Sequence, residues 1–340
     1  MNNTILLKQK INFQWPMENP FIFCAHHHDY FPEGNEKLGP KASLKGRDIG
    51  NDFSNKDGFS MYHGEVVPGF PAHPHRGFET VTIVLEGVVD HFDSKGAKGR
   101  YGNGDVQWLT TGKGCQHAEM FPLVNQDKPN PLELFQIWLN LPAKDKFVEP
   151  EYKMLWKEQV PIIKYCDETG KNSEIRIISG EYNGVKALKP NTASWAYKPD
   201  NHVNIFLVKM DPGSKLILPK GSKTMNRNLY FYQGKDVIYI ENESIQEKTR
   251  IKLVSHQDAL IENGLKESRF LLLEAEPINE PVFQYGPFVM SNKEEIIKAY
   301  QDYQQTHFGG WPWAKYDPVN EMKDERFALY VDGTLENAKK

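Results

Sequence analysis

Residues 69–80 read Gly-Phe-Pro-Ala-His-Pro-His-Arg-Gly-Phe-Glu-Thr, with His73 and His75 one residue apart. Because successive side chains of a β-strand point to opposite faces, His73, His75, Gly77 and Glu79 are expected to share one face of an extended strand. Two imidazoles on the same face can bind one metal ion, and Gly77 leaves space beside them. This segment therefore predicts a strand that supplies metal ligands.

Residues 112–120, Gly-Lys-Gly-Cys-Gln-His-Ala-Glu-Met, predict a second such strand after a glycine-flanked turn. Cys115, His117 and Glu119 lie in phase on one of its faces. If the two strands pair side by side, three imidazoles and one carboxylate converge. Either Glu119 or Glu79 can be the carboxylate ligand, and the other glutamate then lies behind the ligands or acts as an acid or base.

This set of side chains restricts the metal and its chemistry. Nitrogen and oxygen donors without a thiolate suit Fe, Mn, Ni, Cu or Zn. Four protein ligands on a six-coordinate ion leave two positions for a substrate and O₂, whereas the same four around tetrahedral zinc would close the site.

The rest of the chain is rich in short β-type runs separated by turn residues, with 26 Gly and 22 Pro in all. Such spacing predicts an antiparallel barrel or sandwich. A charged segment with three prolines near residues 141–161 separates two β-rich halves. Ser291 and Glu294 are expected to form a capping box that opens a helix, and the aromatic tail after Phe308 to wrap the surface or tie down an edge. The expected strands include Thr80–Leu85, Asp105–Leu109, Leu134–Leu139, Asn204–Met210, Leu229–Tyr232, Asp236–Ile240 and Phe270–Glu274.

Composition excludes several classes of protein. The 340 residues carry 41 Lys+Arg against 45 Asp+Glu, a net charge of -4 without basic blocks, which argues against direct nucleic-acid binding. No apolar run reaches the roughly 20 residues of a membrane span, and the N-terminal residues do not have the order of a secretion signal. The 3 cysteines are too few for a disulfide framework, so a reduced, cytoplasmic protein is expected.

Three segments carry a family resemblance: FPAHPHRGFETVTIVLEG (70–87), GDVQWLTTGKGCQHAEM (104–120) and PVFQYGPFVMSNKEEI (281–296). They resemble the signature segments of the pirin family, within the cupin superfamily, and the resemblance runs from about Asn19 to Ile297. It implies an all-β fold of two tandem antiparallel cupin (jelly-roll-like) barrels with a C-terminal helix and tail. The implied divisions are an N-terminal cupin domain with the metal site (1–145), a C-terminal cupin domain without metal (146–290), and the helix with the tail (291–340).

On the family pattern the metal ligands are His73, His75, His117 and Glu119. The resemblance implies one divalent metal per chain, Fe(II) first, with Mn, Ni, Cu or Zn as alternatives. The residues support a single site independently, because the corresponding part of the second half, Ser214–Asn226, contains no His, Asp or Glu.

Two functions follow from this resemblance. The first is an Fe(II)-dependent dioxygenase of the quercetin 2,3-dioxygenase type, which acts on a small aromatic substrate of the flavonol or catechol kind. In it the metal binds a deprotonated hydroxyl, and Glu119 or Glu79 is the catalytic group that accepts the hydroxyl proton. The alternative is a non-enzymatic iron or redox sensor that regulates a protein partner, either a transcription factor or a metabolic enzyme.

Other conspicuous residues are expected to be structural. The run His26-His27-His28 is expected to make hydrogen bonds in a loop, with at most His26 and His28 on one face. Cys115, which stands where pirin-like sequences carry an aliphatic residue, is expected to be a small buried side chain. Arg76 is expected to form an ion pair, and Phe78 and Trp108 to pack in the core.

Overall fold

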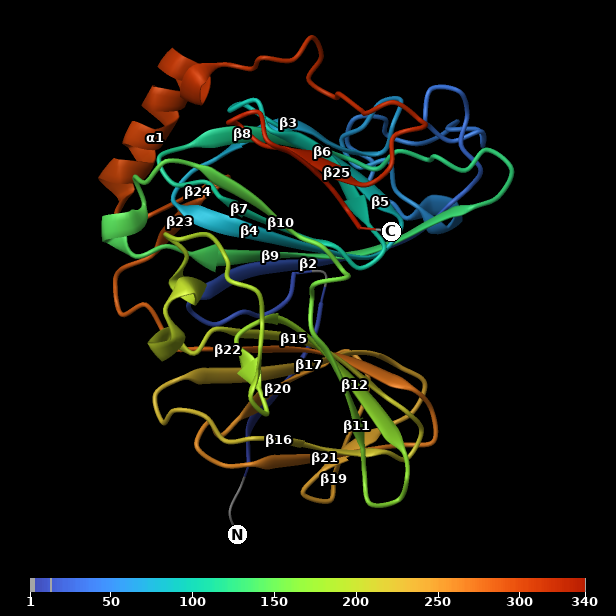
Figure 1. The fold of residues 1–340 in the computed structure, drawn as a ribbon, viewed down its shortest axis with the longest axis vertical. Helices are drawn as coiled ribbons and strands as arrows, with labels where there is room; N and C mark the ends of the chain where they lie inside the picture. Colours follow the sequence, from blue (N-terminus) through green and yellow to red (C-terminus); the bar gives the residue numbers. More distant parts are fainter. Residues whose placement is uncertain (1–3, 13, 340) are drawn as a thin grey trace. The chain divides into compact units, whose positions relative to one another are not determined.

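The computed structural model describes residues 4–12 and 14–339, and it consists mainly of antiparallel β-strands with a helix near the C-terminus (Figure 1). The chain forms two compact units: residues 26–157 with 280–340, called here the first barrel, and residues 1–25 with 158–279, the second barrel. The chain therefore changes unit after residues 25, 157 and 279, whereas the sequence placed divisions after 145 and 290. The difference arises because both ends of the chain, and residues 151–155 in its middle, pair with strands that are distant in sequence, and such pairings leave no local signal.

The first barrel contains two main sheets. One has the strand order β10-β7-β4-β9-β2 and the other the order β26-β25-β6-β5-β8-β3. Its strands are β2 (Phe21–Phe31, which crosses the division at residue 25), β3 (Gly69–His75), β4 (Phe78–Glu86), β5 (Val88–Asp93), β6 (Lys98–Gly102), β7 (Val106–Thr110), β8 (Cys115–Met120), β9 (Asn130–Asn140), β10 (Glu151–Leu155), β23 (Phe283–Tyr285), β24 (Phe288–Met290), β25 (Phe327–Leu329) and β26 (Leu335–Asn337). Short 3₁₀ turns lie at Lys56–Gly58, Ala143–Asp145 and His307–Gly309.

Side chains along β4 alternate between the interior of the first barrel and the opposite face of the sheet. Thr82 contacts Glu119 of β8, which belongs to the other sheet, so Thr82 and the residues in phase with it face inward. Val84, two residues further, belongs to the buried core of this barrel. That core also includes Phe31, Phe59, Met61, Val89, Tyr101, Leu109, Cys115, Phe121, Leu134 and Tyr152.

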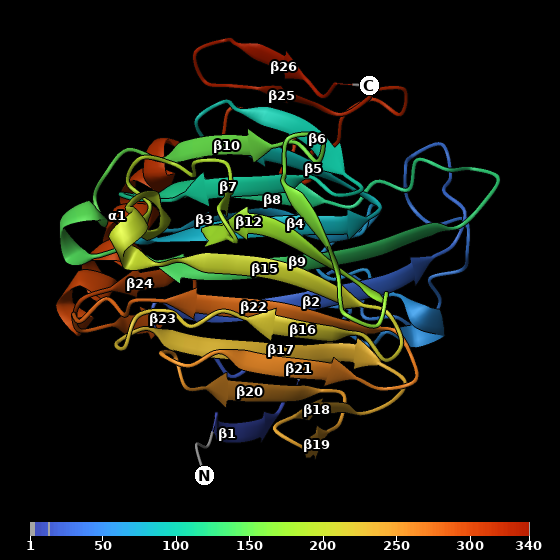
Figure 2. The ribbon, with the colours of Figure 1, turned by 60° about the horizontal axis from the view of Figure 1, so that its bottom comes forward.

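The second barrel has one sheet with the order β1-β20-β17-β22-β15-β12-β11 and a smaller one with the order β16-β21-β18-β19. Figure 2 shows β1, β20, β17, β22 and β15 of the larger sheet as successive neighbours. Its buried core includes Ile177, Phe206, Leu229, Phe231 and Leu272. Its strands are β1 (Ile5–Lys10), β11 (Ile162–Cys166), β12 (Asn172–Ser179), β13 (Glu181–Tyr182), β14 (Val185–Lys186), β15 (Asn204–Met210), β16 (Lys215–Leu218), β17 (Asn226–Gly234), β18 (Ile238–Ile240), β19 (Glu243–Ile245), β20 (Thr249–Leu253), β21 (Ala259–Asn263) and β22 (Ser268–Ala275), with 3₁₀ turns at Trp195–Tyr197 and Pro199–Asn201.

The N-cap of helix α1 (Lys293–Thr306) lies one residue later than expected. Asn292 is the N-cap, and its side chain accepts a hydrogen bond from the Glu295 amide at 2.8 Å. The Glu295 carboxylate in turn accepts from the Ser291 amide at 2.9 Å. The expected box of Ser291 and Glu294 is therefore wrong by one position, because asparagine caps a helix at least as well as serine.

The tail joins the edge of a sheet in the first barrel. β25 pairs antiparallel with β6, and β26 pairs with β25. This confirms the expectation that the tail ties down an edge, and it covers backbone groups that an open edge strand would expose.

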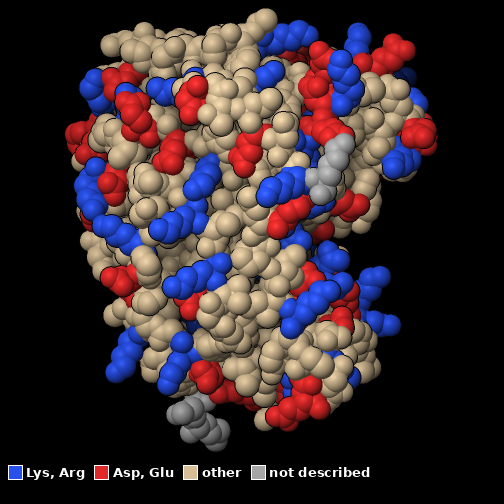
Figure 3. All heavy atoms as spheres, in the orientation of Figure 1, with Lys and Arg blue, Asp and Glu red and all other residues tan. Residues whose placement is uncertain are grey.

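Charges of both signs are interspersed over the face of the molecule in Figure 3, in keeping with the near-neutral balance of the chain. Across the described residues, every helix is too short or too polar to cross a lipid bilayer.

Candidate metal centre

Strands β3 and β8 bring three histidines together in the first barrel. In this antiparallel pair His73 lies directly opposite His117, and His75 lies opposite Cys115. The ring centroids of His73, His75 and His117 are 4.5–5.0 Å apart. One nitrogen of each ring lies within 4.8 Å of the others, and within the described part of the chain this is the group of side chains arranged to hold a metal ion.

A bulge in β3 sets this arrangement. Between Phe70 and His73 the strand advances by three residues while β8 advances from Glu119 to His117, by two. The extra residue shifts the pairing, since one additional position reverses the face of every side chain that follows it. The bulge thus places His73 opposite His117.

The three imidazoles are neutral. Burial lowers the pKa of His73 to about 4, and burial lowers the pKa values of His75 and His117 well below the ordinary value. The Nδ1 of His73 donates to the Pro71 carbonyl at 2.8 Å, and the Nδ1 of His75 faces the Pro287 carbonyl at 3.4 Å. These contacts orient the two rings and leave each Nε2 with a lone pair for a metal ion.

The site contains buried nitrogens that a metal would satisfy. Nε2 of His75 and both ring nitrogens of His117 are buried and have no hydrogen-bond partner among the described residues. Leaving a buried polar atom unpaired costs about 1–3 kcal/mol, so several in one place need a compensating ligand. A divalent ion bound by neutral imidazoles would supply it, and the residues present therefore fit a metal.

Glu119 lies beside the histidines in a network of hydrogen bonds. Its Oε2 is 3.8 Å from Nε2 of His117 and accepts from Gln136 Nε2 at 2.5 Å, while its Oε1 accepts from Thr82 Oγ1 at 3.1 Å. Burial raises the pKa of Glu119, and the charges and hydrogen bonds around it partly oppose this shift. A carboxylate in this position can complete the ligand set.

Glu79 lies elsewhere, and its expected place beside the histidines is wrong. β3 ends at His75, the chain turns at Gly77 with φ of +86°, and Glu79 belongs to β4 in the other sheet. Glu79 accepts hydrogen bonds from Trp108 Nε1 at 2.9 Å and Thr110 Oγ1 at 2.7 Å. It lies three residues from Thr82, so the two side chains point to opposite faces of β4. Alternation had placed Glu79 on the same face as the histidines, but this holds only within one continuous strand, and the turn at Gly77 ends that strand before Glu79.

The residues that support Glu119 were missing from the sequence prediction. Thr82 and Gln136 lie opposite each other on β4 and β9, and their side chains reach Glu119 from the facing sheet. Trp138, two residues after Gln136, lies 5.3 Å from the His75 ring. Alternation along β9 could have placed these side chains on one face, but only the packing of the two sheets shows which face meets the metal site.

The remaining candidates take structural positions. His26 lies in strand β2, not in a loop, where Nε2 contacts Glu133 at 3.0 Å; its ring is 6.0 Å from that of His28. Arg76 forms the expected ion pair, with Asp302 at 2.9 Å. Cys115 is buried, and burial raises the pKa of its thiol. Trp108 and Phe78 are buried, as expected.

Comparisons with known proteins agree with this fold. The family profile described as Pirin matches residues 12–139, and the profile described as Pirin C-terminal cupin domain matches residues 205–309. A pirin-like protein of Solanum lycopersicum is 36% identical over 264 residues, which cover 76% of this chain and 84% of that protein. A Pseudomonas aeruginosa protein, named provisionally as a quercetin 2,3-dioxygenase, is 34% identical over 242 residues, covering 71% of this chain and 80% of its own.

Among solved structures, the crystal structure of quercetin 2,3-dioxygenase from Acinetobacter baumannii is similar to this chain, with a TM-score of 0.70 and 25% identity over 90% of this chain and 98% of that one. The fold and the histidine cluster define a two-barrel cupin protein with a candidate metal centre in its first barrel. The chain belongs to the pirin family. The expected all-β bicupin fold is confirmed.

Proposed function

We propose that this protein is a metal-dependent dioxygenase of the quercetin 2,3-dioxygenase type, with Fe(II) held by His73, His75, His117 and Glu119. The observation that carries the proposal is the convergence of three neutral imidazoles. In two of them, His75 and His117, the buried Nε2 atom has no hydrogen-bond partner within the described chain. The names of the Pseudomonas and Acinetobacter proteins support the choice of reaction. When bound, the metal would supply Lewis acidity toward a phenolic hydroxyl and the capacity for one-electron chemistry with O₂.

The protein's own residues would position the substrate and move its proton. Trp138 and Gln136 are half-buried on the inward face of β9, and Trp138 packs against Phe78 with ring centroids 4.4 Å apart. A flat aromatic substrate can stack on this wall beside the partly exposed His73. Glu119 lies next to His117 and would accept the hydroxyl proton as the catalytic base. Glu79 is left out of this role because it faces the other side of β4.

The test uses full-length protein loaded anaerobically with Fe(II), with metal content measured before the assay. We expect about one metal per chain and O₂ consumption with a flavonol, but not with the matched flavone that lacks the 3-hydroxyl. The His117→Ala variant is the matched control and should lose both metal and activity. Two metals per chain would show that the second barrel also holds one, and full metal load without O₂ consumption across flavonols and catechols would contradict the dioxygenase.

A second candidate is a non-enzymatic iron or redox sensor that regulates a protein partner. The specific observation in its favour is the depth of the site: His75 is 3% exposed and His117 is 0% exposed. A shielded ion can change oxidation state without meeting a substrate. Under this proposal the loaded protein consumes no O₂ with aromatic substrates, and its oxidised and reduced forms differ in hydrogen exchange at the segments that carry His75 and Pro287.

A further inference from the structure

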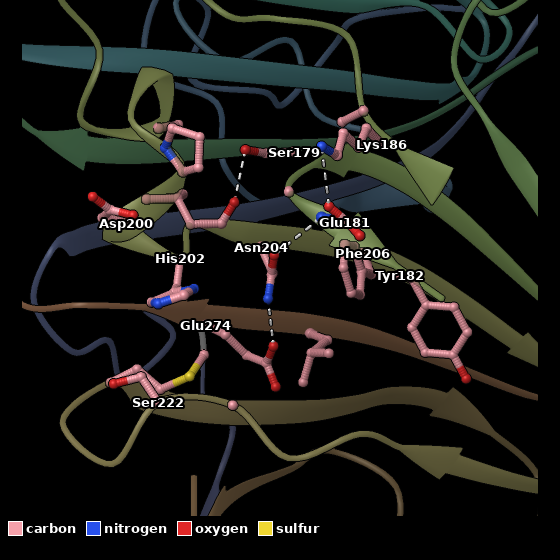
Figure 4. Close-up of a pocket in the computed structure, with 18 of the residues that line it drawn as sticks. Ser179, Glu181, Tyr182, Lys186, Asp200, His202, Asn204, Phe206, Ser222 and Glu274 are labelled. Atoms are coloured by element: carbon pink, nitrogen blue, oxygen red, sulfur yellow. Dashed lines mark hydrogen bonds and ion pairs between the residues drawn. The ribbon is translucent and has the colours of Figure 1, made fainter. Parts of the chain in front are cut away.

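A cavity of about 740 Å³ opens at one end of the second barrel, far along the sequence from the metal ligands (Figure 4). It is lined by the last residues of β12, β16 and β22 and by the first residues of β15 and β17, which meet at the same end of the antiparallel sheets. Its volume lies within the range of roughly 300–1,000 Å³ that small-molecule sites occupy.

A row of polar side chains lines this end of the second barrel. Asn204, Glu274 and Arg227 lie directly opposite one another on the neighbouring strands β15, β22 and β17. The Glu274 carboxylate accepts from Arg227 Nε at 2.6 Å and from Asn204 Nδ2 at 2.8 Å, and Figure 4 shows the contact between Asn204 and Glu274. Because Arg227 neutralises its charge, Glu274 can accept a further hydrogen bond without repelling an anion bound at the rim.

An apolar row lies below the polar one. Phe206 and Leu272 are paired two residues along the same strands, so they share the face of Asn204 and Glu274. Both side chains, with Leu218, line the cavity and belong to the buried core of the second barrel. The floor is therefore apolar and partly aromatic, and it can hold the ring of a ligand.

The rim of the cavity carries an excess of positive charge. Lys189, Lys198 and Lys220 line it and have no carboxylate partner in the described part of the chain, whereas Lys186 faces Glu181 at 3.7 Å. Lys189 lies over the Tyr197 ring at 5.6 Å. Asp200 is the remaining acidic residue of the lining, so the rim favours an anion.

We propose that this cavity binds a hydroxylated aromatic carboxylate. Its ring would lie on Phe206, Leu218 and Leu272, and its hydroxyl would donate to Glu274. The carboxylate would remain at the mouth between Lys198 and Lys220. This ligand site requires no metal and is separate from the proposed dioxygenase centre.

The probe for this proposal is 6-hydroxy-2-naphthoate, titrated calorimetrically into the full-length protein. Two analogues dissect its recognition: 2-naphthoate lacks the hydroxyl, and 2-naphthol lacks the carboxylate. We expect each analogue to bind about tenfold more weakly than the probe, the amount that one lost polar contact of this strength would cause. Equal binding of 2-naphthol and the probe would overturn the role of the lysine rim, and equal binding of 2-naphthoate would overturn that of Glu274.

Four variants locate the probe. Lys198→Gln combined with Lys220→Gln should weaken binding several-fold and reduce its salt dependence, whereas the exposed Lys235→Gln, outside the lining, should bind as wild type. Ala187→Trp would fill the opening at a half-buried position and should abolish binding without disturbing the Glu274–Arg227 pair. His117→Ala should retain binding. Unchanged binding in Ala187→Trp, or loss of binding in His117→Ala, would place the probe elsewhere and overturn the proposal.

Discussion

Thr82 and Glu79 lie three residues apart on β4, and their side chains hydrogen-bond on opposite faces of the sheet. Thr82 donates to Glu119 at 3.1 Å inside the first barrel, whereas Glu79 accepts from Trp108 at 2.9 Å on the other face. The two glutamates that the sequence left as alternatives are therefore separated by the strand itself. This relationship makes their roles distinguishable.

We expect Glu119→Gln to weaken metal binding by tenfold or more, because it replaces a charged oxygen beside His117 with a neutral amide. Glu79→Gln should leave metal affinity unchanged. The measurement is a paired metal titration of the two variants followed by elemental analysis. If Glu79→Gln loses the metal while Glu119→Gln keeps it, our assignment of the carboxylate ligand is wrong.

Removing His117 should separate metal binding from folding. In the metal-free protein both ring nitrogens of His117 lack partners within the described chain, so His117→Ala removes unsatisfied atoms along with the ring. We expect the melting temperature of the metal-free variant to stay close to that of the metal-free wild type, and the stabilisation by metal to disappear. At a metal concentration of 100 times Kd that stabilisation is about 2.7 kcal/mol in the wild type. A metal-dependent shift that survives in His117→Ala would exclude His117 as a ligand.

Gln136 should act as a positioning residue for Glu119. Its amide donates to Glu119 Oε2 at 2.5 Å, and Gln136→Leu would keep the volume of the side chain while removing that donor. We expect metal affinity to fall about 10–100-fold with little loss of stability. Gln136→Glu, which keeps the shape but adds a second carboxylate, should also fail to restore affinity. Wild-type affinity in Gln136→Leu would show that Glu119 is held by its other contacts.

Lys146 should be needed for the turn that follows His75. Its ammonium group is buried and donates to the carbonyls of Gly77 at 2.8 Å and Val289 at 3.0 Å, and to Asn140 Oδ1 at 2.8 Å. Lys146→Met would leave these acceptors without a donor, which we expect to cost about 3 kcal/mol of unfolding free energy. Chemical denaturation measures this loss. The exposed Lys144→Met is the control, and equal stability of the two variants would contradict a role for the Lys146 contacts.

The first barrel should lose stability in mild acid through His27. Burial, with a smaller effect of His26, lowers the pKa of His27 to about 4, and its Nδ1 contacts the hydroxyl of Tyr62 at 2.9 Å. Since an unfolded histidine titrates near 6.5, the unfolded chain binds an extra proton between about pH 6.5 and 4. Stability therefore falls as the pH drops through this window, by about 1–2 kcal/mol between pH 6.5 and 5.

The neighbouring Asp29 changes the pH dependence of stability in the opposite direction. Burial raises its pKa to about 6, so the folded chain binds the extra proton between about pH 6 and 4. Urea denaturation of wild type and His27→Phe at pH 7 and pH 5 isolates the histidine, because Asp29 is present in both. A wild type that loses no more stability than His27→Phe over this range would contradict the assignment.

Local sequence was enough to predict those features that depend on neighbouring residues. The expected strands correspond to β4, β7, β9, β15, β17, β18 and β22, because alternating β-rich runs between turn residues carry their own signal. The closeness of His73, His75 and His117 was also predictable, since two strands with ligands in phase needed only to pair. The helix was predicted with an error of one residue at its cap, where asparagine and serine compete on equal terms.

The family pattern named Glu119, but residue spacing left Glu79 open, and the tertiary structure places Glu119 beside His117. Only the tertiary structure showed which residues hold Glu119 and where the ends of the chain pair. Alternation predicts which face a side chain occupies only within one continuous strand. The chain turns at Gly77, so Glu79 belongs to β4 in another sheet. Thr82 and Gln136 reach Glu119 across the barrel, and β1 and β25 join strands that are hundreds of residues away in sequence. Such contacts depend on how whole sheets pack and pair, and no local pattern of residues encodes that.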